Sequence, residues 1–123
     1  MDDSRPIFQQ IAEQIENDII SGALPEETQV PSTNEFAAFH RINPATAGKG
    51  VNLLVDAGIL YKKRGIGMFV APGARARLVA ERRDQFRTQY VEPLLLEAGK
   101  LGISAAQLAE MIQKAGVTAG ARS

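Results

Sequence analysis

The sequence predicts a mainly α-helical fold with one small β-hairpin, and three observations support this prediction. Isoleucines recur at every fourth residue near the N-terminus, prolines and glycines mark the ends of several segments, and two β-prone segments flank a glycine-containing turn at residues 64–67. Apolar residues make up 45% of the 123-residue chain and charged residues 23%. Because this composition is typical of globular proteins, we expect a folded chain of one domain, alone or with an appendage.

A first helix is predicted over residues 6–21. The isoleucines that form its apolar face are Ile7, Ile11, Ile15 and Ile19. Pro6 suits the first helical turn, because an amide there has no partner within the helix. Gly22 suits the C-terminal end, where a left-handed backbone conformation often ends a helix.

A short second helix is predicted over residues 33–40, after an extended segment at residues 28–30. Ser32 and Glu35 have the spacing of a capping box, in which each side chain bonds to the backbone amide of the other residue. The side chains expected to face inward from this helix are Phe36, Ala37 and Phe39.

A third helix is predicted over residues 44–57, because Asn43 suits an N-cap and Pro44 suits the first helical position. Its inward side chains are expected to be Ala47, Val51, Leu54 and Val55. Gly48 and Gly50 each cost roughly 1 kcal/mol relative to alanine inside a helix, which indicates close approach of another group. We expect Gly50 to face the second helix.

A hairpin follows the third helix. Residues 59–63 and 68–71 are β-prone, and they flank the segment Arg64-Gly65-Ile66-Gly67. Two short helices joined by a tight turn and followed by a hairpin are the outline of a winged helix-turn-helix. We therefore expect residues 1–73 to form a winged helix-turn-helix domain.

Residues 74–123 are predicted to form two C-terminal helices and a short flexible tail that begins at Gly116. Pro93 is expected to kink the first of these helices, because proline cannot donate a backbone hydrogen bond. A break follows at residues 99–102, and Ser104 suits the N-cap of the last helix. Two helices cannot enclose a core, so we expect this segment to pack against its copy in a second chain and form a symmetric homodimer.

The composition argues against an enzyme, a metal site and a cofactor. The chain has no cysteine and a single histidine, His40, so neither a thiolate site nor a histidine-based metal site is expected. Glycine-rich phosphate-binding motifs are absent, and the carboxylates are scattered along helix faces. No apolar run approaches the ~20 residues that span a bilayer, and the N-terminus does not resemble a signal peptide. We therefore expect a cytoplasmic protein with no membrane association.

The charges are unevenly distributed and indicate a nucleic-acid partner. Residues 1–40 contain one basic and eight acidic residues, whereas residues 41–77 contain seven basic residues and one acidic residue. In a helix-turn-helix, the second helix enters the major groove of DNA with its N-terminal residues at the base edges. Here the third predicted helix takes that place. We expect Thr46 and Lys49 to contact bases or phosphates, and Gly48 to allow close approach to DNA.

Further basic residues follow this helix in the sequence. Lys62, Lys63 and Arg64 precede the hairpin turn, where they can reach phosphates or the minor groove. Arg75 and Arg77 stand at the start of a helix, where the helix dipole disfavours cations unless another interaction uses them. We expect DNA phosphates to supply that interaction.

Several motifs, in this order, resemble those of GntR-type bacterial transcription regulators. The matching segments are Pro6-Ile7-Phe8-Gln9-Gln10-Ile11, Ser21-Gly22-Ala23-Leu24, Val30-Pro31-Ser32, Ile42-Asn43-Pro44-Ala45-Thr46 and Arg64-Gly65-Ile66-Gly67-Met68-Phe69-Val70. The Asn-Pro-x-Thr start of the third helix, the Gly-Met-Phe-Val strand and the short C-terminal part are similar to the YtrA subfamily in particular. The resemblance covers residues 5–115.

The resemblance implies a dimeric winged-helix repressor whose C-terminal helices mediate dimerisation and which releases DNA when a small effector binds. By position, it implies DNA contacts from Ser32, Thr46, Lys49, Arg64 and Gly65. With the neighbouring residues of the basic segment included, the predicted DNA-binding set is Ser32, Arg41, Asn43, Thr46, Lys49, Lys63, Arg64 and Gly65.

The sequence departs from the family pattern at two places. Asn34 stands where the family commonly has arginine, so a strong phosphate or base contact is absent there or supplied elsewhere. Glu26-Glu27 replaces the usual Pro-Gly in the loop after the first helix, which leaves the geometry of that loop open.

The partners expected are a second chain, double-stranded DNA and a small effector. Two recognition helices related by a two-fold axis predict a pseudo-palindromic operator. The residues expected to contact an effector, with core packing as their alternative role, are Phe86, Tyr90 and Met111. Two other functions stay open, namely a winged-helix module for protein–protein assembly and a non-specific architectural DNA binder. The acidic residues 1–40 argue against the architectural function, because non-specific binders gain from cationic surface everywhere.

Overall fold

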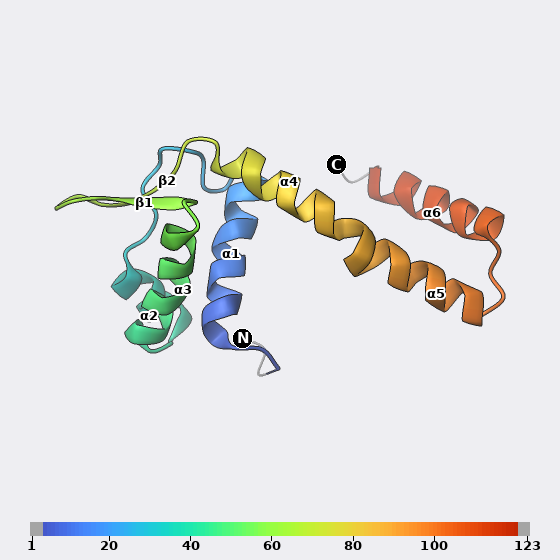
Figure 1. The fold of residues 1–123 in the computed structure, drawn as a ribbon, viewed down its shortest axis with the longest axis horizontal. Helices are drawn as coiled ribbons and strands as arrows, with labels where there is room; N and C mark the ends of the chain where they lie inside the picture. The colour runs from blue at the N-terminus through green and yellow to red at the C-terminus, as the bar shows by residue number, and fades with distance from the viewer. Residues whose placement is uncertain (1–3, 121–123) are drawn as a thin grey trace. The chain divides into compact units, whose positions relative to one another are not determined.

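The structure is a computed structural model that describes residues 4–120, with the backbone alone for residues 117–120. It consists of helices and one two-stranded antiparallel hairpin, which confirms the predicted fold class (Figure 1). The elements are α1 (Ile7–Ser21), α2 (Thr33–His40), α3 (Pro44–Asp56), β1 (Leu60–Lys63), β2 (Gly67–Val70), α4 (Ala74–Phe86), η1 (Arg87–Val91), α5 (Glu92–Lys100) and α6 (Ala105–Gly120). They belong to two compact units, residues 1–81 and 82–123, and the division falls within α4.

Helix ends in the first unit follow the predicted signals. In α2, Ser32 Oγ accepts a hydrogen bond from Glu35 N at 3.1 Å, and a carboxylate oxygen of Glu35 accepts one from Ser32 N at 3.4 Å. In α3, Asn43 Oδ1 accepts a hydrogen bond from Ala45 N at 2.7 Å. These caps satisfy amides that have no partner inside the helix. Pro6 differs in one detail, because it is the N-cap of α1 rather than a residue of the first turn.

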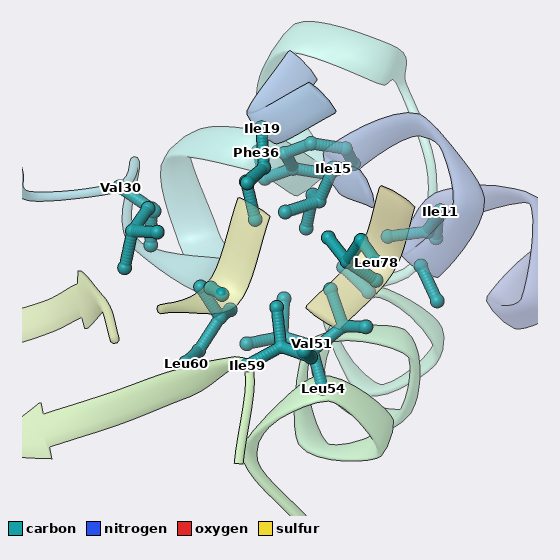
Figure 2. Close-up of a cluster of buried hydrophobic side chains, with 14 of the residues drawn as sticks. Ile11, Ile15, Ile19, Val30, Phe36, Val51, Leu54, Ile59, Leu60 and Leu78 are labelled. Carbon is teal, nitrogen blue, oxygen red and sulfur yellow. The ribbon is translucent and has the colours of Figure 1, made fainter. Parts of the chain in front are cut away.

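The core of the first unit lies between α1 and α3. Figure 2 shows Ile11, Ile15 and Ile19 of α1 around the same apolar space as Val51 and Leu54 of α3. The remaining buried core residues are Ala12, Val30, Phe36, Ala37, Ala47, Ile59, Leu60, Val70, Ala74 and Leu78. The isoleucine spacing therefore identified the buried face of α1 correctly at Ile11, Ile15 and Ile19, whereas Ile7 in the first turn is 38% exposed, because the core does not reach the start of the helix.

Two side chains predicted to face inward do not do so fully. Phe39 is 84% exposed, because the eight-residue α2 has a narrow buried face that Phe36 and Ala37 occupy. The Phe39 ring instead lies edge-on to the ring of His40, with 5.0 Å between centroids. Val55 is half-buried at the margin of the core.

Gly50 is a point of very close approach between α1 and α3. A Cβ atom placed on Gly50 would lie 2.6 Å from the carbonyl oxygen of Phe8 and 2.9 Å from Ile11 Cβ. The prediction that Gly50 faces the second helix is therefore wrong, since its missing side chain makes room for α1. Gly48 is the glycine that faces α2, and a Cβ there would lie 3.6 Å from Thr33 Cγ2, an ordinary contact distance.

The segment of residues 28–30 is extended, as the sequence predicts, and the structure shows in addition that it pairs with the hairpin. The amide of Val70 donates a hydrogen bond to Thr28 O at 3.0 Å, and the amide of Val30 donates one to Met68 O at 2.9 Å. The hairpin is thus fixed to the loop between α1 and α2 as well as by its own antiparallel pairing.

Arg75 and Arg77 bind the C-terminal ends of two helices. Arg75 Nε donates to Ile20 O at 2.9 Å, and Arg77 Nη2 donates to Ala57 O at 2.8 Å. Cations are favourable at these positions, because a helix C-terminus carries the negative end of the helix dipole. The structure thus gives both arginines a partner within the protein that the sequence did not indicate, and their contact with DNA phosphates stays a prediction.

The second unit contains the end of α4 and the elements that follow it. The helix is irregular near Pro93, as predicted, but the irregular turn η1 precedes the proline. There the amide of Glu92 donates to the carbonyl of Arg87, which is the five-residue spacing of a π-helical turn. Ser104 caps α6 as predicted, because its Oγ accepts a hydrogen bond from Gln107 N at 3.1 Å.

The end of α6 differs from the prediction of a tail. The sequence predicts a tail from Gly116, but α6 continues to Gly120. The remaining predicted tail, residues 121–123, lies outside the described residues. None of the helices within residues 4–120 has the length and apolar character needed to cross a membrane.

Replacing Gly50 by alanine should destabilise the protein, because the new Cβ would meet a backbone carbonyl and a branched side chain. We expect the free energy of unfolding to fall by about 1–3 kcal/mol, the usual cost of overpacking, despite the higher helix propensity of alanine. Gly48→Ala is the matched control, since its Cβ has room, and it should raise stability by up to about 1 kcal/mol. Urea denaturation measures both effects. Equal losses in the two variants would contradict the packing argument.

Candidate nucleic-acid interface

The predicted DNA-binding residues of α3 lie at the start of the helix. Asn43 is exposed, and its side-chain oxygen is occupied by the helix cap. Thr46 is half-buried, whereas Lys49 is exposed. Lys49 is therefore accessible to a DNA base or phosphate, whereas the side-chain oxygen of Asn43 already accepts the capping hydrogen bond of α3.

The ammonium group of Lys49 lies over an aromatic ring that the sequence did not single out as functional. Its Nζ atom is 4.0 Å from the centroid of the Phe8 ring on α1, within the range of a cation–π interaction. The pairing follows from the close approach of α1 to α3 at Gly50. No pattern along the chain shows it, because the two residues belong to different helices.

Arg41 ends α2 in a left-handed conformation. Its φ is +55°, which is uncommon for a residue with a side chain, and its amide donates to Ala38 O at 3.3 Å. The backbone of Arg41 thus forms the turn between α2 and α3. Its side chain is exposed, and a contact between its guanidinium group and DNA stays a prediction.

The wing, residues 60–70, presents two of its lysines on opposite faces. Lys63 Nζ lies 4.3 Å from the centroid of the Phe69 ring and 5.9 Å from that of Tyr61. Because side chains alternate along a strand, Lys62 lies on the other face of the hairpin. The sequence alone gave no reason to distinguish these two neighbouring cations.

An open groove of about 450 Å³ lies between the wing and the N-terminal end of α2. The residues that line it are Pro31, Ser32, Thr33, Lys62, Lys63, Arg64, Gly65, Ile66, Gly67 and Met68. It brings four of the predicted residues together, and it adds Lys62, which was outside the predicted set. Three cations and no carboxylate are among the described residues of this lining, which favours an anionic ligand such as a DNA phosphate.

The groove does not include the other four predicted residues. Arg41, Asn43, Thr46 and Lys49 lie instead on α3 and on the turn before it. The predicted set is therefore divided between two surfaces of the first unit, and contact of either surface with DNA stays a prediction.

The turn of the wing depends on two glycines and on Gln29. Gly65 has a φ of +78°, a conformation that favours glycine. A Cβ on Gly67 would overlap the side chain of Gln29, whose Nε2 donates a hydrogen bond to Ile66 O at 3.1 Å. The turn that carries Arg64 is thus tied to the extended segment between α1 and α2.

Glu27, in the loop after α1, adopts a backbone conformation that favours glycine. Its φ is +65°, which costs a residue with a side chain roughly 1–2 kcal/mol. Its carboxylate accepts a hydrogen bond from the Tyr61 hydroxyl at 2.6 Å, which links the loop to β1. This hydrogen bond is the main reason that the pKa of Tyr61 is raised above its ordinary value of 10.0.

The residues predicted to contact an effector lie in two places in the second unit. The rings of Phe86 and Tyr90 are 5.5 Å apart between centroids, and both are exposed. Met111 is also exposed and lines a pocket of about 410 Å³ near Leu101 and Ile103. Neither ring is among the described residues that line that pocket. The effector site stays a prediction.

The segment from α1 to β2, which holds the helix-turn-helix and the wing, matches a known family. Residues 7–70 match the family described as "Bacterial regulatory proteins, gntR family". The chain belongs to the GntR family. This confirms the resemblance found in the sequence, and it makes the protein a GntR transcription regulator with a DNA-binding helix-turn-helix rather than an enzyme.

Two individual proteins extend the similarity over most of the chain, and a third matches about half of it. The HTH-type transcriptional repressor YtrA of Bacillus subtilis (strain 168) is 28% identical over 111 residues, which cover 90% of this chain and 85% of YtrA. A GntR family transcriptional regulator from Listeria monocytogenes has a solved structure with a TM-score of 0.74 and 27% identity, covering 93% of this chain and 98% of that one. The AraR DNA-binding domain, solved in complex with operator ORX1, has a TM-score of 0.52 and 31% identity, covering 55% of this chain and 81% of that one.

Replacing Glu27 by glutamine should lower the pKa of Tyr61. The raised pKa means that the protonated hydroxyl is stabilised in the folded state, so the interaction is complete at neutral pH and is lost as the pH rises above 10. The chain has two tyrosines, so the Tyr90→Phe background leaves Tyr61 as the sole phenol in an ultraviolet absorbance titration. Glu26→Gln is the matched control and should leave the midpoint unchanged. An unchanged midpoint in Glu27→Gln would rule out the hydrogen bond.

Proposed function

We propose that this GntR regulator is a homodimeric repressor that binds a pseudo-palindromic operator through α3 and the wing. In each chain, the first turns of α3 enter the major groove and the wing binds the adjacent phosphates. The observation that carries this proposal is the groove beside the wing, whose lining includes Lys62, Lys63 and Arg64 and, among the described residues, no carboxylate. Such a cationic groove suits the phosphate backbone of DNA.

The start of α3 also suits a DNA-reading role. Ala45 is exposed and Thr46 is half-buried, so small side chains stand next to the longer Lys49. Small side chains allow a helix to approach the base edges, and their methyl groups can contact the methyl group of thymine. Lys49 adds a cation that can bind a phosphate or a guanine.

The repressor role is supported by the similarity to YtrA, which is itself named a repressor and aligns over most of both chains. Binding to an operator is supported by the similarity to the AraR DNA-binding domain, whose structure contains one. The similarity to YtrA extends through both units of the chain, whereas the similarity to the AraR DNA-binding domain covers about half of the chain.

Homodimerisation is supported by the apolar surface of the second unit. Its exposed large apolar side chains are Phe86, Tyr90, Leu94, Leu95, Leu96, Leu101, Met111 and Ile112. Among the described residues of that unit, Ala98 and Leu108 are the buried apolar ones, so a single chain leaves most of its apolar side chains in water. Apolar surface of this extent is typical of an interface, and the same segment of a second chain can cover it with two-fold symmetry.

Fluorescence anisotropy with the DNA upstream of its own gene tests the proposed operator binding. We expect the protein to prefer that duplex to a scrambled one by roughly a thousandfold. Arg64→Ala should weaken binding and reduce the slope of log affinity against log salt by about 1, because one phosphate contact is lost. Lys100→Ala removes a cation outside the matched residues 7–70 and should leave both quantities unchanged.

The other outcomes of this titration identify the two alternative functions. Equal affinity for both duplexes, with a strong salt dependence, would indicate an architectural DNA binder and contradict the proposal. Weak binding that is indifferent to Arg64→Ala would direct attention to a protein partner instead.

Replacing Leu95 by glutamate should weaken self-association at least tenfold, because a carboxylate would have to leave water at the proposed interface. Sedimentation equilibrium measures the dissociation constant, and the parent protein should sediment with the mass of two chains. Glu97→Gln, at an exposed position of the same helix, is the control and should remain dimeric. A parent protein that is monomeric at all concentrations would overturn the proposed dimer.

A further inference from the structure

We propose that Phe8 is a positioning residue for DNA binding, because its ring holds the ammonium group of Lys49 in place on α3. This inference rests on the proposed function, since it assigns to α1 a part in the contact that α3 makes with DNA. Phe8 lies outside the helix-turn-helix, in the first turn of α1. It is not among the residues expected to touch DNA.

The geometry of the pair is that of a cation–π contact. Lys49 Nζ lies 4.0 Å from the centroid of the Phe8 ring, and the attraction comes from the negative face of the ring. Phe8 is half-buried and Lys49 is exposed, so the ring is held by the protein while the ammonium group still faces solvent. Within residues 4–120, the ion pairs found do not include Lys49, so the ring is the partner that the structure gives to this cation.

The position of the ring is set by the contact between α1 and α3. Gly50, the residue next to Lys49, lacks the Cβ that would lie 2.6 Å from the Phe8 carbonyl oxygen. The backbone of Phe8 is therefore fixed against the same helical turn that carries Lys49. Any displacement of α1 along α3 would separate the ring from the ammonium group.

This arrangement prepares the lysine for binding. A free lysine side chain samples many rotamers, and ordering it when DNA binds reduces the affinity. Lys49 is already restrained in the free protein, so less ordering remains when DNA binds. Lys63 on the wing shows the same arrangement, with its Nζ atom 4.3 Å from the centroid of the Phe69 ring.

A double-mutant cycle in the promoter-binding assay tests the role of Phe8. Phe8→Leu keeps an apolar side chain but removes the ring, and we expect it to weaken promoter binding about two- to fivefold when Lys49 is present. In a Lys49→Met background, Phe8→Leu should cause no further loss, because there is no cation to hold. Phe8→Tyr retains the ring face and should bind the promoter duplex as the parent protein does.

Nuclear magnetic resonance of the free protein gives a second readout that does not depend on DNA. The ε-methylene protons of Lys49 should be shifted upfield by the ring current of Phe8. The shift should disappear in Phe8→Leu and persist in Phe8→Tyr. Thermal unfolding of each variant shows whether the fold is retained.

The possible failures are distinguishable. A parent protein that does not select the promoter duplex would overturn the proposed function, and this inference with it. Equal losses from Phe8→Leu in the presence and absence of Lys49, with parent binding intact, would overturn the role of Phe8 alone. The absence of an upfield shift in the parent protein would do the same.

Discussion

The close contact between α1 and α3 at Gly50 is the constraint on which the rest of the first unit depends. Without a Cβ at this position, the Phe8 carbonyl and the Ile11 side chain come within distances that any other residue would prevent. The isoleucine face of α1 then packs against Val51 and Leu54 and closes the core. The contact that closes the core also determines the position of the Lys49 ammonium group over the Phe8 ring. Packing and the candidate site thus share one determinant.

The wing depends on the loop between α1 and α2 in a similar way. Residues 28–30 extend the hairpin by pairing with β2, and Gln29 bonds to the turn. Glu27 adopts a left-handed backbone conformation, and its carboxylate accepts a hydrogen bond from the Tyr61 hydroxyl. The loop therefore controls the orientation of Arg64 relative to Ser32. The part of the loop that makes these bonds, residues 27–30, is not in the lining of the groove. The side chain of Glu27 adds a further bond between this loop and β1, which a glycine at the same position could not make.

Local signals in the sequence predicted the elements well, because capping and periodicity act between residues close in the chain. The Ser32–Glu35 box, the Asn43 cap and the isoleucine spacing all lie where the structure has them. Contacts between distant residues were not predictable in this way. Gly50 was expected to face the wrong helix, and Lys62 could be distinguished from Lys63 only after the hairpin register was known. The cost of a glycine in a helix indicates that something approaches closely, but it does not indicate what.

The bonds of Arg75 and Arg77 have a mechanical consequence. The two residues leave α4 about 200° apart around its axis, because each residue of an α-helix turns by about 100°. They reach the ends of two different helices, at Ile20 and Ala57. Rotation of the first turn of α4 in either direction would stretch both hydrogen bonds, so this turn resists torsion instead of acting as a swivel. Torque applied to that turn passes directly to the C-terminal ends of α1 and α3.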